Sequence, residues 1–348
     1  MAIYLTMILT SGLFAALSQV YRERHRNFFL MMAFVPLILV SALRTDVGVD
    51  FENYRQIYEE VKNIPWSQNR IEPLYFLLAQ ASCFLYDHFQ VMVAASALLT
   101  QVFFWKAIKA QSCNTFLSVL LYITAGSYFS SLCYIRQYLG LGLVFLSYRF
   151  LKERRFLPFA ALVMLAAMFH KSMIIALPLF VLTFSFPLWL YFLITGVLIA
   201  TSAFSEPLTQ IAIKLLGYEE YVGTVHLQTD VSVTGIFIAA LVTAGALAYR
   251  KQLLEDDPHN ISYINFAIAS LWLYALCWWI PMVGRVGMLF TVMNIVSIPK
   301  IISMEKNRNL RLVYYVGILA VFFAFWYMDL RTNDSAYLWL LPYQWILG

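Results

Sequence analysis

A polar interval, Ser41–Glu72, interrupts an otherwise apolar sequence and holds the residue types that could carry out chemistry. At its start, Arg44, Asp46 and Asp50 lie close to Gly48. An arginine can hold a phosphate through paired hydrogen bonds, and a carboxylate can act as a general base or orient a sugar hydroxyl. The same charges could instead neutralise one another at the mouth of a loop. Both interpretations place a charged turn between apolar segments.

A second candidate is the pair Arg136–Gln137, which opens an apolar segment containing Gly140 and Gly142. The glycines allow close helix packing beside a charged pocket. Because the N-terminus of a helix favours anions, Arg136 is a candidate phosphate ligand. The alternative is that its side chain reaches the lipid headgroups and serves as an anchor.

Two more candidates lie further along the chain. His170 occurs in MFHKSMI, between apolar runs that leave no room for a solvated loop, and could accept a proton near neutral pH. It could equally hydrogen-bond to a neighbouring helix. Arg285 follows Trp278 and Trp279 in WWIPMVGRVGMLF, a combination that suits a glycolipid because sugars stack on aromatic rings and phosphates bind arginine. A tryptophan belt at the membrane interface is the competing interpretation.

The elements that must position these residues are membrane helices. The 348 residues are 61% hydrophobic and 12% charged, whereas soluble domains carry about 25% charge. Apolar runs of about 17–22 residues recur, which is the length that crosses a bilayer as a helix. We therefore expect an all-α polytopic membrane protein with about 12–14 transmembrane helices in a single integral domain, residues 1–348. No P-loop, HExxH or cysteine-histidine set occurs, so we expect no metal and no cofactor, and the net charge of +5 does not indicate nucleic acid.

Basic loops predict the orientation, because lysine and arginine concentrate on the cytoplasmic side. Placing Tyr21–Arg26, Tyr148–Arg155 and Lys300–Arg311 inside puts the N-terminus outside. The extracytoplasmic side then holds a loop at 44–72 with an amphipathic helix, a second loop at 205–230 with another, and the other polar turns. An odd number of crossings is needed between Glu72 and Phe116, so we expect Glu72–Tyr86 to enter the bilayer and return, or to lie along its surface.

The chain resembles the EpsG family, grouped with the Wzy-type polysaccharide polymerases. The resemblance is carried, in order, by SALRTDVGVDFENY, EPLY, YIRQYLGLGLVFLSYRFL, AAMFHKSMIIALPLF and GRVGMLF, which extend over nearly the whole length. Each motif is loose, and the ordered set is more specific. Thr45 departs from the pattern, in which an aromatic residue often follows the arginine.

The resemblance implies a multispan glycosyltransferase of the bacterial inner membrane, active in O-antigen or exopolysaccharide synthesis. Such enzymes transfer a growing glycan from undecaprenyl pyrophosphate to a lipid-linked repeat unit on the extracytoplasmic side. Donor and acceptor lipids are then the expected partners, within membrane lipid and with a chain-length regulator protein as a further candidate. The site positions carried over are Arg44, Asp46 or Asp50, Glu72, Arg136, His170 and Arg285, with Gln137 and Tyr54 as further substrate contacts. The resemblance does not decide which of Asp46, Asp50, Glu72 and His170 is the base.

We expect metal-independent transfer, in which arginines neutralise the pyrophosphate as a divalent metal does elsewhere. Two other functions remain open. A glycolipid flippase or transporter would need polar groups through the depth of the bilayer, whereas here they concentrate on one predicted face. Another lipid-linked glycosyltransferase, such as an O-antigen ligase, would differ only in its acceptor.

Overall fold

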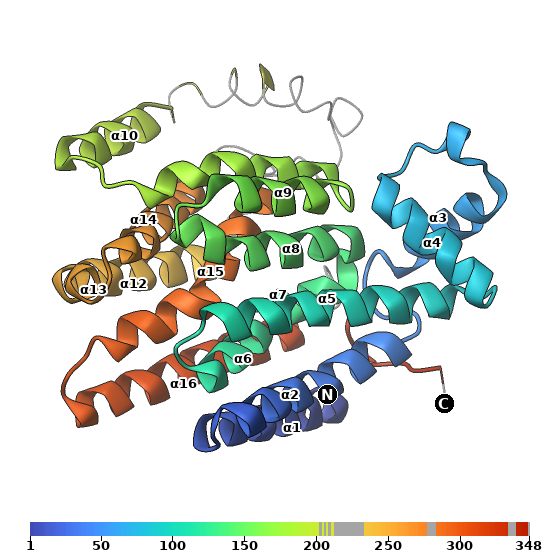
Figure 1. Ribbon diagram of the computed structural model, residues 1–348, viewed down its shortest axis with the longest axis horizontal. Coiled ribbons are helices and arrows are strands. Elements are labelled where there is room, and N and C mark those ends of the chain that lie inside the picture. The colour runs from blue at the N-terminus through green and yellow to red at the C-terminus, as the bar shows by residue number, and fades with distance from the viewer. Residues whose placement is uncertain are drawn as a thin grey trace. The chain divides into compact units, whose positions relative to one another are not determined.

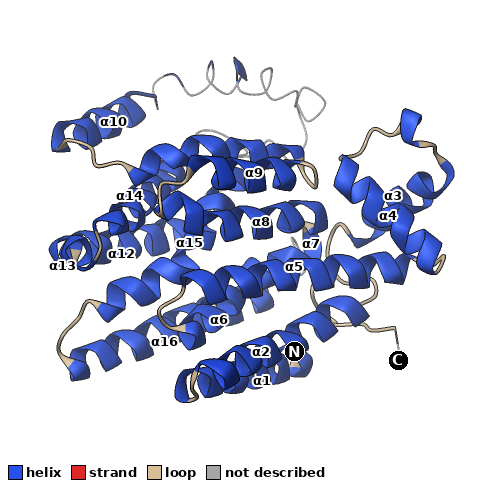
Figure 2. Cartoon of the chain, in the orientation of Figure 1, coloured by secondary structure: helices blue, strands red, loops and turns tan. Residues whose placement is uncertain are grey.

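The computed structural model describes residues 1–201, 204, 207, 210–211, 233–276, 283–332 and 339–346. These residues fold into helices joined by short turns, and no strand occurs among them (Figure 2). Within the described ranges, the one isolated β-bridge pairs Arg44 with Trp345. The predicted all-α class is confirmed.

The helices divide into two compact units, which are described separately. Unit 1 comprises Met1–Pro178 and Glu305–Gly348, and unit 2 comprises Leu179–Met304. The helices of unit 1 are α1 (Ala2–Val20), α2 (Glu23–Leu43), α3 (Phe51–Asn63), η1 (Trp66–Gln68), α4 (Pro73–Leu85), α5 (Phe89–Gln111), α6 (Thr115–Thr124), α7 (Ser127–Cys133), α8 (Ile135–Lys152), α9 (Phe156–Ala167) and α16 (Arg308–Thr332) (Figure 1). The helix η2 (Lys171–Thr183) crosses the boundary, and unit 2 contains α10 (Leu188–Thr201), α12 (Val233–Ala248), α13 (Arg250–Asp256), η6 (Pro258–Asn260), α14 (Ile261–Leu276) and α15 (Val283–Ser303).

Several helices are long and apolar enough to cross a membrane. The described residues hold five such helices, or up to seven if each of two bent helix pairs is one span. Four shorter apolar helices of 10–17 residues accompany them: Pro73–Leu85, Phe156–Ala167, Lys171–Thr183 and Leu188–Thr201. The chain is therefore a multi-pass membrane protein. The larger number expected from the sequence includes these shorter segments.

Small residues allow the helices of unit 1 to pack closely. On α8, a Cβ atom at Gly140 would lie 2.6 Å from the Met173 side chain, and one at Gly142 would lie 2.9 Å from Cβ of Phe103 on α5. Close approach through small residues is a common way for membrane helices to associate. The two glycines therefore hold α8 between α5 on one side and the α9–η2 segment on the other, which fixes the position of Arg136 at the start of α8.

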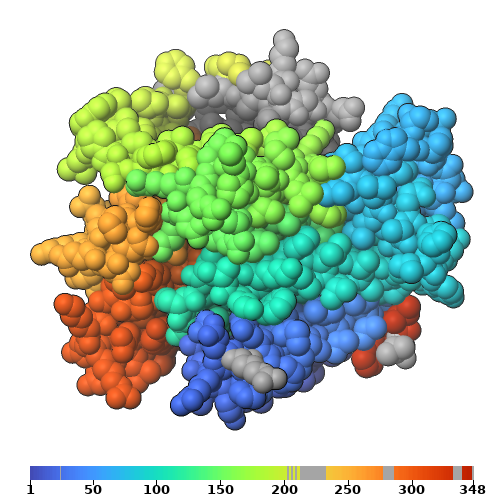
Figure 3. All heavy atoms as spheres, in the orientation of Figure 1, coloured from blue at the N-terminus to red at the C-terminus, as the bar shows by residue number. Residues whose placement is uncertain are grey.

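The amphipathic helix predicted in the polar interval is α3. Its buried residues are Phe51, Tyr54, Tyr58 and Val61, which lie on one face at helical spacing, as the sequence predicted. The other predicted amphipathic segment, within 205–230, lies almost entirely outside the described residues. In the space-filling view, the segment containing α3 and α4 forms a lobe at the edge of unit 1 (Figure 3).

Several turns of unit 1 meet at one end of its helices. We call this the polar end and define it by residues 44–90, 132–136, 168–171 and 339–346. The side-chain amide of Gln90, at the start of α5, donates to the carbonyls of Ala42 (2.6 Å) and Arg44 (2.9 Å), at the end of α2. The segment between these helices thus begins and ends at the same place. The 13-residue helix α4 lies within this segment, and its expected entry into the bilayer, or its position along the surface, stays a prediction.

The segment η2 is a 3₁₀-helix of 13 residues that begins directly after His170. Runs of more than a few residues are uncommon for this helix type, which has three residues per turn. Its first buried positions follow that period, since Met173, Ala176 and Leu179 have exposed fractions of 1%, 0% and 8%. The apolar segment that follows His170 is therefore helical but is more tightly wound than an α-helix.

Candidate functional site

Glu72, Arg136 and His170 come together at the polar end, although they are far apart in the sequence. Glu72 is the residue before α4, where Pro73 begins the helix with a preset backbone angle. Arg136 lies in the first turn of α8. A single non-helical residue, Tyr134, separates this helix from α7. His170 lies between α9 and η2. Each side chain is thus placed by the end of a helix.

Glu72 is the centre of this cluster. Its Oε2 atom accepts a hydrogen bond from Nη1 of Arg136 at 2.9 Å. Its Oε1 atom lies 3.2 Å from Nδ1 of His170 and accepts a hydrogen bond from the backbone N–H of Lys171, also at 3.2 Å. A backbone hydrogen bond of 2.9 Å from Leu74 to the carbonyl of Met168 joins α4 to the end of α9 beside the cluster. We call Glu72, Arg136 and His170 the Glu72 cluster.

The charge of Glu72 is strongly stabilised. Burial by itself would raise the pKa of this carboxyl, but the contact with His170 and the positive charge of Arg136 outweigh burial and lower the pKa of Glu72 to about 2. The group is therefore ionised throughout the physiological range. A carboxylate this acidic is a poor proton acceptor near pH 7 and is better suited to orienting its two cationic or hydrogen-bonding neighbours.

Two tyrosines complete the surroundings of Arg136. Tyr54 of α3 interacts with the guanidinium through its hydroxyl, and burial raises the pKa of Tyr54 to about 12, although Arg136 opposes this change. The ring of Tyr75, in the first turn of α4, lies 5.8 Å from the guanidinium carbon. Sequence reasoning did not select Tyr75. Its signal is its position three residues after Glu72, which caps the start of α4, because side chains at this spacing lie on the same side of a helix.

The cluster is partly open to its surroundings. The side chains of Glu72, Arg136 and His170 are 11%, 27% and 25% exposed. Nε of Arg136 is buried and has no hydrogen-bond partner among the described residues. A buried donor without a partner is uncommon, because it loses its hydrogen bonds to water. The geometry therefore leaves the exposed parts of the Arg136 guanidinium and the His170 imidazole available to a ligand.

Arg44 has a different environment from the one expected. Its side chain is 2% exposed, and its nitrogens donate to the carbonyls of Ser41 (2.6 Å), Leu132 (2.9 Å) and Val47 (3.2 Å). Ser41 and Leu132 are in the last turns of α2 and α7, where helix carbonyls lack partners and the helix dipole favours a cation. The guanidinium therefore joins two helix ends, and carbonyl groups rather than Asp46 or Asp50 stabilise its charge.

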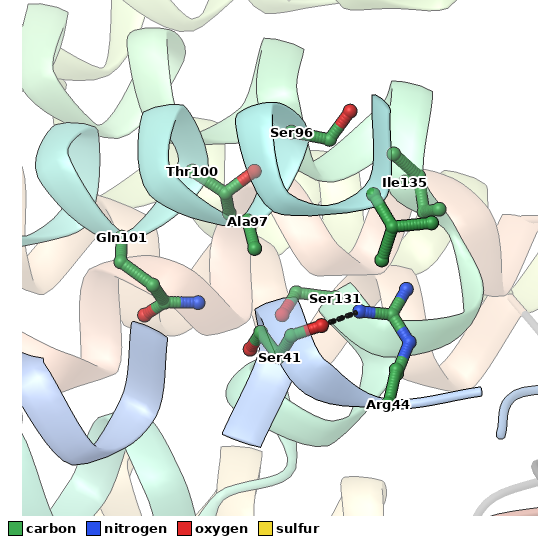
Figure 4. A pocket seen from close by; sticks show the side chains of 9 residues that line it. Ser41, Arg44, Ser96, Ala97, Thr100, Gln101, Ser131 and Ile135 are labelled. Atoms are coloured by element: carbon green, nitrogen blue, oxygen red, sulfur yellow. Dashed lines mark hydrogen bonds between the residues drawn. The ribbon is translucent and has the colours of Figure 1, made fainter. Parts of the chain in front are cut away.

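A small cavity lies beside Arg44, between α2, α5 and the end of α7. Its volume is about 10 Å³, roughly the space that one water molecule needs. In Figure 4, the side-chain amide of Gln101 extends from α5 toward Ser41 of α2, whose carbonyl accepts the hydrogen bond from Arg44. Nε2 of Gln101 and Oγ of Ser96 are buried without a hydrogen-bond partner among the described residues. The cavity is too small for a sugar or a pyrophosphate.

The remaining candidates divide into two groups. Asp46 forms a 2.8 Å ion pair with Arg55 on the surface, and Asp50 precedes α3 and accepts a hydrogen bond from Asn53 at 3.3 Å. Gln137 is half-buried beside Arg136 in α8. By contrast, the side chain of Arg285, together with Trp278 and Trp279, lies outside the described residues. Of the nine residues predicted to form the site, the structure thus brings Glu72, Arg136, His170 and Tyr54 into one group.

Comparison with known proteins gives one result. No curated protein and no solved structure matches the chain significantly. The model of the EpsG family matches residues 27–345, a range that includes every residue of the Glu72 cluster. This match covers most of the 348 residues and supports a polysaccharide polymerase-like role in a membrane. The chain belongs to the EpsG family.

Proposed function

We propose that the protein polymerises lipid-linked oligosaccharide repeat units, by transferring a growing glycan from a polyprenyl pyrophosphate to a hydroxyl of the next lipid-linked unit. The observation that carries the proposal is the Glu72 cluster, in which one ionised carboxylate holds both an arginine and a histidine at the end of a membrane helix bundle. Family membership supports the polymer-forming chemistry. The pyrophosphate-linked donor and acceptor are part of the proposal.

His170 acts as the general base in this mechanism. Oε1 of ionised Glu72 lies 3.2 Å from Nδ1, so we assign the hydrogen to that nitrogen, which leaves Nε2 as the proton acceptor. Nε2 takes the proton of the acceptor hydroxyl. At the same time, the hydroxyl oxygen forms a bond to the anomeric carbon of the donor. Glu72 is unsuited to this step because of its low pKa, and it orients the imidazole instead.

Arg136 stabilises the departing group. When the bond between the anomeric carbon and the pyrophosphate oxygen breaks, the electron pair and the negative charge go to the pyrophosphate. A guanidinium can meet this charge with fixed hydrogen-bond donors. Only one of its terminal nitrogens contacts Glu72, and 27% of the side chain is exposed. Arg136 thus retains donors for the leaving group while Glu72 and Tyr75 fix its orientation.

The location of the cluster suits a lipid-linked substrate. Unit 1 contains helices of membrane-spanning length, and the cluster lies at their polar end rather than midway along them. A substrate with its lipid tail among the helices would present its pyrophosphate and sugars at this end. We place the polar end on the extracytoplasmic side of the bacterial inner membrane, following the distribution of basic loops.

The test is a chain-extension assay with purified protein in lipid nanodiscs and a defined undecaprenyl pyrophosphate repeat unit. We expect the wild type to give a ladder of products, and His170→Gln and Arg136→Gln to lower the rate by about 10²-fold or more. Arg155→Gln is the matched control, because Arg155 is exposed in the turn between α8 and α9 and pairs with Glu153. Ladders at the wild-type rate from folded His170→Gln and Arg136→Gln would contradict the mechanism.

The same substrate separates transfer from transport when the protein is reconstituted in sealed lipid vesicles. A flippase would move the labelled lipid-linked unit across the vesicle membrane without lengthening its glycan. Products longer than the substrate would support the polymerase. Translocation without any lengthened product would contradict the proposed polymerase.

A further inference from the structure

A second hollow lies at the polar end, on the flank of α3 that faces the start of α5. Its volume is about 400 Å³, and its polar lining residues are Thr45, Arg55, Glu59, Asp87, His88 and Gln90. Pockets for small molecules commonly have volumes of about 300–1,000 Å³, and most of their walls are apolar. This cleft has a suitable volume, and six of its eight lining residues carry side chains that can form hydrogen bonds, the other two being Phe89 and Ile346. Its shape and chemistry therefore favour a polar ligand.

The charges around the cleft are paired with one another. Arg55 forms ion pairs of 2.8 Å with Asp46 and 2.9 Å with Glu52. Lys62 lies 2.7 Å from Asp87 and 3.3 Å from Glu59. Recognition of a phosphate relies on cations whose charge is free to meet the anion. Because the cations here already have carboxylate partners, the cleft favours an uncharged ligand with many hydroxyl groups.

Several lining groups are also held in place before a ligand arrives. The side-chain amide of Gln90 is fixed by the carbonyls of Ala42 and Arg44, and Nδ1 of His88 accepts the backbone N–H of Gln90 at 3.1 Å. The ion pairs fix Arg55 and Asp87 in the same way. Polar groups that are already ordered lose little entropy on binding, so such an array can recognise adjacent hydroxyls with useful affinity.

The helix α3 links this cleft to the Glu72 cluster. Tyr54, on its buried face, interacts with Arg136, whereas the next residue, Arg55, lines the cleft. The two regions therefore border the same helix at the polar end. In a glycolipid, the sugars extend away from the pyrophosphate, so a substrate held at the cluster by its pyrophosphate would place sugar units over α3.

We propose that the cleft is a glycan subsite, which binds an uncharged sugar unit of the lipid-linked chain through Glu59, Asp87 and Arg55. This inference rests on the proposed function, because it assigns the cleft to the same substrate. The cluster acts on the pyrophosphate end of the glycan, and the cleft holds its hydroxyl-bearing part in register with the transfer site.

The experiment measures binding rather than transfer. The probe is the oligosaccharide mixture released by mild acid hydrolysis from the polysaccharide of the host strain, fractionated by size and titrated into purified full-length protein by saturation-transfer NMR. We expect Glu59→Gln and Asp87→Asn each to raise the dissociation constant about tenfold, since each removes a charged hydrogen-bond acceptor. Glu60→Gln is the matched control, because Glu60 is the next residue of α3, is exposed and does not line the cleft.

Two further measurements distinguish this subsite from the Glu72 cluster. Arg136→Gln should bind the oligosaccharide as the wild type does, and inorganic pyrophosphate should not displace it. An unchanged dissociation constant for both Glu59→Gln and Asp87→Asn, or displacement by pyrophosphate, would overturn the subsite while leaving the transfer mechanism intact. Conversely, normal chain extension by His170→Gln would refute that mechanism, whereas oligosaccharide binding that depends on Glu59 would still support the subsite.

Discussion

Replacing Glu72 by glutamine would remove the charge that holds the cluster together and keep the size of the side chain. In the folded protein, the pKa of this carboxyl falls from its ordinary 4.5 to about 2. One pKa unit corresponds to about 1.4 kcal/mol, so ionised Glu72 contributes about 3 kcal/mol to the free energy of unfolding at neutral pH. Solvent screening reduces this little, because the side chain is 11% exposed. We therefore expect Glu72→Gln to be destabilised by about 3 kcal/mol at pH 7.

The dependence on pH gives the sharper test. The folded pKa lies below the unfolded one, so the contribution is complete above about pH 4.5, declines as the pH falls and vanishes below about pH 2. At pH 3, about 1 kcal/mol should remain. The measurement is unfolding by SDS in mixed micelles at pH 7, 5, 4 and 3, for the wild type, Glu72→Gln and the exposed control Glu60→Gln.

The wild type and Glu72→Gln should differ most at pH 7 and converge as the pH falls, whereas Glu60→Gln should match the wild type throughout. A difference between the wild type and Glu72→Gln that stays constant from pH 7 to pH 3 would mean that glutamine disturbs packing and not charge. Equal unfolding at pH 7 would refute the electrostatic account of the cluster.

Two further substitutions test how the polar end is built. Gly48→Ala should lower the free energy of unfolding by about 2 kcal/mol or more, because Gly48 has a φ of +106° and its Cβ atom would lie 2.7 Å from the carbonyl oxygen of Leu132. Gly126→Ala is the control in the same denaturation assay, since it shares a positive φ (+84°) but has no atom within 4 Å, and a loss as large as that at Gly48 would contradict the steric reason. Arg44→Lys should cost about 2 kcal/mol, because an ammonium cannot reproduce the planar guanidinium that contacts three carbonyls. Arg22→Lys, at an exposed position, should be neutral in a thermal-shift assay, and equal melting temperatures for the two variants would refute the role of Arg44.

The sequence predicted the helical class and the face of α3 well, because both depend on local periodicity. Hydrophobic residues at helical spacing place Phe51, Tyr54, Tyr58 and Val61 on one side whatever the rest of the chain does. The positions of the basic loops require an odd number of crossings between Glu72 and Phe116. This requirement predicted that the segment after Glu72 enters the bilayer and returns, or lies along its surface. The hydrogen bonds from Gln90 to the end of α2 bring the two ends of the polar segment together, and its path relative to the bilayer stays a prediction. Which side of the membrane the polar end faces stays a prediction.

The composition of the candidate site was harder to predict, because long-range contacts decide it. Arg44 and Arg136 are both arginines at helix ends, and nothing local distinguishes them. The structure surrounds Arg44 with carbonyls and leaves it 2% exposed, whereas it gives Arg136 a carboxylate partner and partial exposure. In the same way, Asp46 and Glu72 are both carboxylates in the polar interval, but Asp46 pairs with Arg55 on the surface. Motif matching selected all four residues and could not rank them.

The winding of η2 also determines how far a short segment can reach. A 3₁₀-helix rises about 2.0 Å per residue and an α-helix about 1.5 Å, so 13 residues extend about 26 Å in the first form and about 20 Å in the second. The tighter winding thus lets a segment too short for an α-helical span nearly match a hydrocarbon core of about 30 Å. Because His170 immediately precedes η2, rewinding the segment as an α-helix would shorten it by about 6 Å, twice the distance that separates His170 from Glu72. The length of η2 therefore decides how far His170 lies from the other end of this apolar segment.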